Sequence, residues 1–278
     1  MPIAELPVWE VSLMVYGSIT VERTIRFSEF KGLRLNDPFY SDIEIRRNQF
    51  DSGVEATVTA FAPTQYLARE AAILFFGQTL DALALQINQP LYLNFNDNRS
   101  SSNVNRNQTS NASYNTSRRV RKEEWQEAFK EARLLASTET TFLRSLSWYR
   151  KGLHSEDPFD KFLAFWNAIE IVARKYHPPI PRTRTNGSKS QIWESFKALW
   201  GECENWSIIQ GQGLWIDNNY EIRMTIAHGT QPIDIETVKA VTQKLDTIQQ
   251  VAHKFLVDWR HQKLNPQAPP HLRDMLGY

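Results

Sequence analysis

A polar tract at residues 98–120 divides the chain into two parts with different hydrophobic periods. The tract is rich in Asn, Ser and Thr and contains almost no large apolar side chain. Such a segment buries too little apolar surface to offset the conformational entropy lost when it is ordered. The sequence therefore predicts a flexible linker at 98–120, with one domain before it, at 1–97, and a second domain after it.

Before this tract, apolar and β-branched residues alternate with polar residues, which is the pattern of half-buried strands. The alternation is clearest in the stretches WEVSLMVYGSITV, RTIRF, DIEIRR, VEATVTAFA and PLYLNF. One stretch, PTQYLAREAAILFFGQTLDALALQI, instead has the spacing of a helix that begins near Pro63 and Thr64. The first domain is thus predicted to be α+β, with antiparallel strands covered by one helix. The sequence does not indicate its role.

After the tract, apolar residues recur at helical spacing over 121–262, and a tail follows at 263–278. Short breaks such as HSEDP and PPIPRTRTNGSKS separate the expected helices. Connections this short favour antiparallel neighbours, so the second domain is predicted to be a helical bundle. Tryptophans at helical spacing are expected in its core, notably Trp148, Trp166, Trp193, Trp200 and Trp259.

Composition excludes several classes of protein. No apolar run in the sequence approaches the roughly 20 residues that span a bilayer, and the first residues do not resemble a signal peptide. We therefore expect a cytoplasmic protein that does not bind membranes. The single cysteine excludes a disulfide framework and a thiolate metal cluster within the chain. No spacing of ligands predicts a metal or another cofactor.

Net charge is close to zero, at +1, but its distribution is uneven. Residues 99 to 122 include six basic side chains and no acidic one. Two interpretations stay open for this basic segment: a solvated linker, or a basic arm that recognises an acidic partner.

The helical half also contains a pattern that resembles a known superfamily. The stretch RSLSWYRKGLHSEDPFDKFLAFWNAIEIVARKYH, followed by NYEIRMTIAHG, resembles the HEPN superfamily, and within it the Apea-like and methylamine-utilisation J-type branch. This resemblance implies a helical bundle over roughly 121–262. Many members are metal-independent ribonucleases that act as dimers, often as toxins or antiphage effectors, and others are inactive. The Arg-x(4 to 6)-His motif of the superfamily falls on Arg223 and His228.

One position departs from the motif of active members. The residue after the arginine is commonly polar in them, whereas it is Met224 in this chain. The alternative function therefore stays open: a catalytically inactive HEPN module that binds RNA or a protein.

The spacing of the pair also bears on its chemistry. Residues five apart on a continuous helix diverge by roughly 140° around the axis. Gly229 and Pro232 predict, however, that the helix ends at His228, which frees this side chain from helical geometry. An arginine provides a planar donor fork for phosphate, and a histidine can act as base or acid in RNA cleavage. The alternative is that Arg223 and His228 have no catalytic role and belong to an ordinary helix terminus.

A single histidine does not easily serve both ends of the reaction at phosphorus, so two copies across a dimer axis form the simpler catalyst. We therefore expect a homodimer with RNA as its partner, and an antitoxin or activator protein is a further expected partner. Polar residues on the helix that contains FWNAIE provide supporting candidates: Glu170 could pair with Arg223, and Asn167 lies nearby, although an exposed helix face explains both residues equally well. Basic residues near the following turn are candidates for RNA binding, or form a solvated loop: Arg174, Lys175, Arg182 and Arg184.

Overall fold

The structure, a computed structural model, describes residues 6–29, 39–48, 52–94, 117–182, 185–228 and 235–264. The chain divides into two compact units, Met1–Arg133 and Leu134–Tyr278. Most of the predicted linker and all but the first two residues of the predicted tail lie outside the described residues, as do Arg184, Gly229 and Pro232.

The first unit contains a five-stranded antiparallel sheet, which confirms the predicted α+β class. The strand order is β3-β4-β5-β1-β6. Inward-facing apolar residues pair across the centre of the sheet, for example Val11 with Val58 and Val15 with Val54. The strands are β1 (Val8–Tyr16), β3 (Ile25–Ser28), β4 (Phe39–Arg47), β5 (Gly53–Phe61) and β6 (Tyr92–Asn94).

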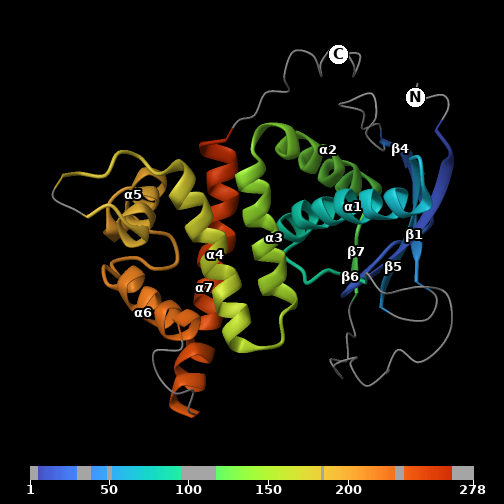
Figure 1. Cartoon of the computed structure of the whole chain (residues 1–278). Coiled ribbons are helices and arrows are strands. Elements are labelled where there is room, and N and C mark those ends of the chain that lie inside the picture. Colours follow the sequence, from blue (N-terminus) through green and yellow to red (C-terminus); the bar gives the residue numbers. More distant parts are fainter. Residues whose placement is uncertain are drawn as a thin grey trace. The chain divides into compact units, whose positions relative to one another are not determined.

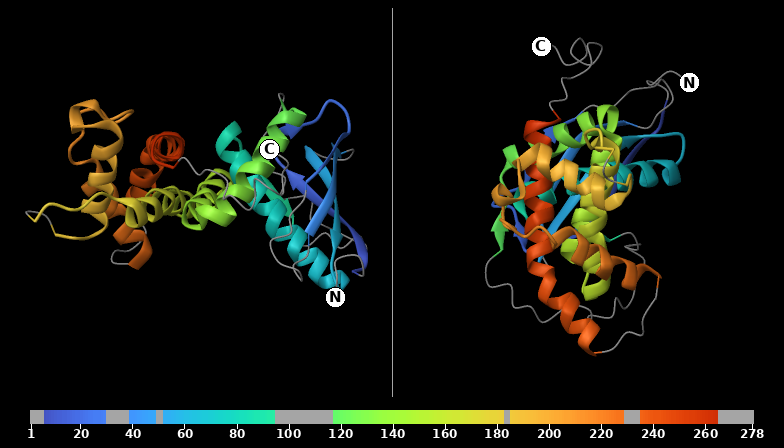
Figure 2. Two further views of the ribbon diagram at one scale, coloured as in Figure 1. Left: turned by 90° about the horizontal axis from the view of Figure 1, so that it is seen from above. Right: turned by 90° about the vertical axis from the view of Figure 1, so that its left-hand side faces the viewer.

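Helix α1 (Gln65–Ile87) covers one face of this sheet, as Figures 1 and 2 show. It begins where the sequence predicts, because the Thr64 side chain caps it by accepting a hydrogen bond from the Leu67 amide at 3.2 Å. Among the described residues, α1 is the one helix long and apolar enough to cross a membrane. Much of it is buried inside the unit, however, as in the core helix of a soluble domain, so this composition is weak evidence for a membrane span.

Helix α2 (Lys122–Thr138) belongs mostly to the first unit, which differs from the predicted domain start at residue 121. Its Trp125 stacks on Phe76 of α1 with ring centroids 6.0 Å apart, and its Phe129 meets the edge of Phe27 at 5.3 Å. Because the apolar side of α2 packs on the first unit, the division follows Arg133. The first unit therefore contains two helices, where the sequence predicted one.

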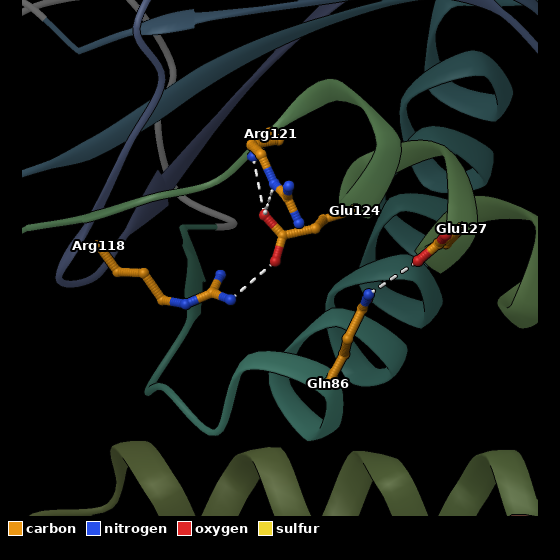
Figure 3. A network of polar contacts seen from close by, with 5 residues as sticks. All are labelled: Gln86, Arg118, Arg121, Glu124 and Glu127. Atoms are coloured by element: carbon orange, nitrogen blue, oxygen red, sulfur yellow. Dashed lines mark hydrogen bonds and ion pairs between the residues drawn. The ribbon is translucent and has the colours of Figure 1, made fainter.

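Ion pairs hold the end of the basic segment against the first unit (Figure 3). The Arg118 guanidinium donates to Glu124 at 2.7 Å, and the Arg121 amide donates to the same carboxylate at 2.9 Å. Arg119 pairs with Glu22 at 3.2 Å. These contacts follow a short parallel pairing of β2 (Ile19–Thr20) with β7 (Arg118–Arg119). The basic side chains of Arg118 and Arg119 are therefore paired with carboxylates of the first unit at this end of the segment.

The second unit is helical, which confirms the predicted class of the C-terminal half. Helix α4 is central and packs on α3, α5, α6 and α7 (Figure 1). Of the five tryptophans expected in the core, Trp166 and Trp259 are buried as predicted, whereas Trp148, Trp193 and Trp200 are only half-buried. The helices are α3 (Thr140–His154), α4 (Pro158–Tyr176), α5 (Ser188–Trp200), the 3-10 turn η3 (Cys203–Asn205), α6 (Trp215–His228) and α7 (Ile235–Gln262).

Candidate functional site

Helix α6, which carries the Arg-His motif, is anchored by its first half and exposed in its second half. Trp215, Ile216 and Asn219 are buried, and the Trp215 ring stacks on Trp166 of α4 at 6.4 Å. From residue 221 onward every side chain of α6 is half-buried or exposed. The buried first turns therefore fix the position of the last two turns, in which His228 is exposed and Arg223 is half-buried.

Arg223 and His228 meet in the structure. Nη1 of Arg223 lies 3.4 Å from Nε2 of His228. When the imidazole carries its proton on Nδ1, its Nε2 can accept a hydrogen bond from the guanidinium. As predicted, His228 is the last residue of α6 and is exposed. The long arginine side chain spans the divergence that an ideal helix would impose on residues five apart. The motif therefore brings a guanidinium and an imidazole together at a helix end.

Glu170 of α4 also contacts Arg223. Its Oε2 lies 3.9 Å from Nη2 of Arg223, and both side chains are largely shielded from solvent, at 16% and 25% exposure. The pairing that the sequence suggested for Glu170 is therefore present, although the distance exceeds that of a good hydrogen bond. Asn167, one turn earlier on α4, is half-buried. Among the described residues it is not one of the groups in contact with Arg223.

Met224, the residue that departs from the motif of active members, is a further contact of Arg223. Nη1 of Arg223 lies 3.4 Å from the Met224 sulfur. A thioether is a weak acceptor, so this contact satisfies the guanidinium only in part. The methionine therefore lies against the candidate site and leaves the guanidinium able to take a stronger acceptor.

The arrangement is suited to a phosphate group. A phosphate oxygen is an ionised acceptor, and its charge-assisted hydrogen bond with arginine is shorter and stronger than the contacts that Arg223 makes now. A phosphate that takes the Arg223 donors would also release Nε2 of His228, which could then accept or donate a proton. Glu170 would keep one edge of the guanidinium oriented. The site therefore combines an anion-binding group with an acid-base group.

The other predicted basic residues lie farther along α4. Arg174 and Lys175 are exposed in its last turn, and Arg182 is exposed in the following loop. Arg174 is four residues after Glu170, so it shares that face of α4 one turn farther on. Arg184 lies outside the described residues. In the part of the chain that the structure describes, no three His, Cys, Asp or Glu side chains are grouped so that they could hold a metal ion.

Sequence reasoning missed one neighbour of the motif, Tyr220. It precedes Arg223 by three residues on α6, contacts Trp166 at 6.3 Å and lies beside Lys189 of α5. The signal was present in the sequence, because an aromatic residue three positions before the motif arginine shares its helix face.

A known family resembles the part of the chain that contains the candidate site. Residues 145–257 match the family model described as methylamine utilization protein MauJ. This match confirms the resemblance found for the C-terminal half, where residues 145–257 are consistent with a MauJ-type, HEPN-like domain. No curated protein and no solved structure matches the chain significantly.

The matched segment of the MauJ-type domain runs from α3 into α7 and includes Glu170, Arg223 and His228. The residues that form the candidate site thus all belong to the matched segment. The sheet and helix α1 of the first unit lie outside it.

Proposed function

We propose that the MauJ-type domain is a HEPN-type, metal-independent endoribonuclease. His228 takes or gives the proton, and Arg223 holds the scissile phosphate while negative charge develops on it. The 2′-hydroxyl of RNA is the nucleophile, so the products are a 2′,3′-cyclic phosphate and a free 5′-hydroxyl. The observation that carries the proposal is the 3.4 Å contact between Arg223 and His228 at an exposed helix end.

The proposal includes a homodimer that brings two His228 side chains to one cleft. Each copy has one such histidine, and one imidazole does not easily act both as base toward the 2′-hydroxyl and as acid toward the 5′-oxygen. Sedimentation at micromolar concentration should report a dimer, and a strict monomer with full activity would exclude this arrangement.

We further propose that the protein is cytoplasmic and acts as a toxin or antiphage effector. A ribonuclease in that compartment endangers the RNA of its own cell, so an antitoxin or activator protein is expected to control it.

The direct test is RNA cleavage by the full chain in EDTA. Wild-type protein should cut single-stranded RNA and leave 2′,3′-cyclic phosphate ends. His228→Ala should lower the rate by about 10² to 10⁴-fold. His261→Ala is the matched control, because His261 is also exposed in the last turn of a helix but lies outside the site. Equal cleavage by both variants, or cleavage only after divalent metal is added, would refute the proposal.

The contact of Met224 with Arg223 supports a second candidate function, a catalytically inactive module that binds RNA or a protein. An apolar side chain beside the guanidinium is unexpected in a polar cleavage site. This reading predicts RNA binding without turnover, and binding that does not change in His228→Ala. The same cleavage assay, combined with a binding measurement, therefore separates the two functions.

A further inference from the structure

A second group of side chains lies one helical turn before Arg223 on α6. The Tyr220 ring is half-buried and contacts the fully buried Trp166 ring of α4 at 6.3 Å. The Lys189 ammonium, from the first turn of α5, lies 5.4 Å from the centroid of the Tyr220 ring. The same ammonium pairs with Asp217 of α6 at 2.8 Å. An aromatic ring and a cation are therefore held together at the surface.

The position of this group relative to the motif follows from helix geometry. Tyr220 and Arg223 are three residues apart, so their Cβ atoms are about 5–6 Å from one another on the same side of α6. Trp166 and Glu170 are four apart on α4 and face the same crossing of the two helices. Where α6 crosses α4, Tyr220 thus contacts Trp166, and Arg223 contacts Glu170 one helical turn farther along.

We propose that Tyr220 and Lys189 form a nucleotide subsite next to the scissile phosphate. The proposal rests on the function proposed above, and it assigns this subsite to the nucleotide that neighbours the phosphate on Arg223. The Tyr220 ring contacts the base or sugar, and the Lys189 ammonium binds the adjoining phosphate. Aromatic rings beside a cation are the recurrent means by which proteins bind single-stranded nucleic acid.

The contacts of Lys189 suit this role. An ammonium has three donors, and Asp217 occupies one of them, so donors remain for a phosphate. Lys189 is cationic at neutral pH in any case, and the hydrogen bond with Asp217 raises its pKa further. The carboxylates of Asp217 and Glu221, which both interact with Lys189, are the nearby charges that oppose an anion. The ammonium therefore has a fixed position beside the ring while its side chain stays 45% exposed.

The test measures affinity in a background that does not cut. His228→Ala protein is titrated into a fluorescein-labelled single-stranded RNA of twelve mixed nucleotides, and fluorescence anisotropy is followed at several salt concentrations. Tyr220→Ala should weaken binding by about 5- to 100-fold, whereas Tyr220→Phe should bind nearly as the parent does. Lys189→Gln should reduce the slope of log affinity against log salt by about 0.7, the value for one lost phosphate contact on a single strand.

The matched control for the lysine is Lys239→Gln. Lys239 is also exposed and paired with a carboxylate, Glu236 at 2.9 Å, but it lies on α7 outside the proposed subsite. It should change neither the affinity nor the slope. Circular dichroism of each variant checks that the unit stays folded, and Lys189→Gln keeps the test decisive if Tyr220→Ala does not fold.

The outcomes separate this inference from the proposed function. If wild-type protein cleaves RNA but Tyr220→Ala and Lys189→Gln leave affinity and salt slope unchanged, the subsite is wrong and the ribonuclease stands. If RNA binds and both variants weaken it, yet wild-type protein never cleaves, the subsite stands and the ribonuclease fails. If the His228→Ala protein shows no affinity for RNA, the subsite is overturned.

Discussion

The two units hold their arginines in different ways. Arg46, on the sheet of the first unit, makes two hydrogen bonds with Glu55, at 2.9 and 3.1 Å. That pairing raises the pKa of Arg46. Arg223, in the second unit, has its nearest carboxylate at 3.9 Å and otherwise contacts a sulfur and an imidazole at 3.4 Å. The Arg46 guanidinium makes a close bidentate pair with a carboxylate, whereas the Arg223 guanidinium is held in position by longer and weaker contacts.

This difference indicates what each arginine can do. A bidentate pair with a carboxylate gives Arg46 a strong anionic partner within the protein, so a phosphate would have to compete with Glu55 for it. A shielded guanidinium with weak acceptors gains more from a phosphate than it loses. The long contacts of Arg223 with its neighbours are therefore the feature that distinguishes a candidate site from an ordinary surface ion pair.

The largest expected effect is on cleavage. Arg223→Ala should lower the rate by about 10² to 10³-fold, because it removes the group that stabilises charge on the phosphate. Arg223→Lys should stay well below wild type, since an ammonium does not reproduce the planar fork. Arg46→Ala should cleave as wild type does. If Arg46→Ala and Arg223→Ala reduce the initial rates equally, the contrast between the two guanidinium groups has no functional meaning.

Much of the fold could be predicted from the sequence, because hydrophobic period is a local property. The strands around Val11 and Val58 follow from it, whereas the start of α1 at Thr64 and the end of α6 at His228 follow from residues typical of helix ends. Which of the two units α2 packs on could not be predicted. Its periodicity defines an apolar side but not which domain that side packs on, and Trp125 in fact meets Phe76 of α1.

The sequence could predict which residues belong to the candidate site better than it could predict which of them are in contact. The family pattern pointed to Arg223 and His228, but their spacing alone gave a divergent pair, and the reach of the arginine side chain brings them together. Glu170 lies more than 50 positions earlier in the chain, so the sequence could suggest its pairing with Arg223 only as one of two interpretations, and the packing of α4 on α6 decides between them. The ion pairs of Arg118 and Arg119 likewise depend on partners that sequence spacing does not identify.

One half-buried titratable group in each unit should respond to pH, in opposite directions. Burial, assisted by Arg150, lowers the pKa of His154 from 6.5 to about 4. The unfolded chain therefore binds this proton first, and the second unit should lose stability as pH falls from 6.5 toward 4, by less than the full pKa shift would give because His154 is partly solvated. Burial raises the pKa of Glu29 in the first unit, against the attraction of Arg133, so protonation of Glu29 favours that unit as pH falls.

Hydrogen exchange followed by mass spectrometry, at pH values from 7 to 4.5 and corrected for intrinsic rates, can observe the two units separately. His154→Gln should flatten the loss of protection in α3 and α4, and Glu29→Gln should leave it unchanged. A pH response of the second unit that persists in His154→Gln would show that other groups dominate it.

The smallest expected effects come from two helical glycines, one in each unit, which differ in the space around them. A Cβ on Gly152 of α3 would lie 2.6 Å from the Phe165 ring of α4, whereas a Cβ on Gly77 of α1 would meet nothing within 4 Å. Gly152→Ala should therefore destabilise the protein by about 1–3 kcal/mol, because α3 and α4 must separate or Phe165 must leave its rotamer. Gly77→Ala should instead stabilise it by about 0.5–1 kcal/mol, since alanine loses less backbone entropy in a helix. Urea unfolding followed by circular dichroism measures both. Equal changes of the same sign in the free energy of unfolding would contradict the contrast. If the contact with the Phe165 ring causes the loss in Gly152→Ala, a double variant that also carries Phe165→Leu should recover part of it.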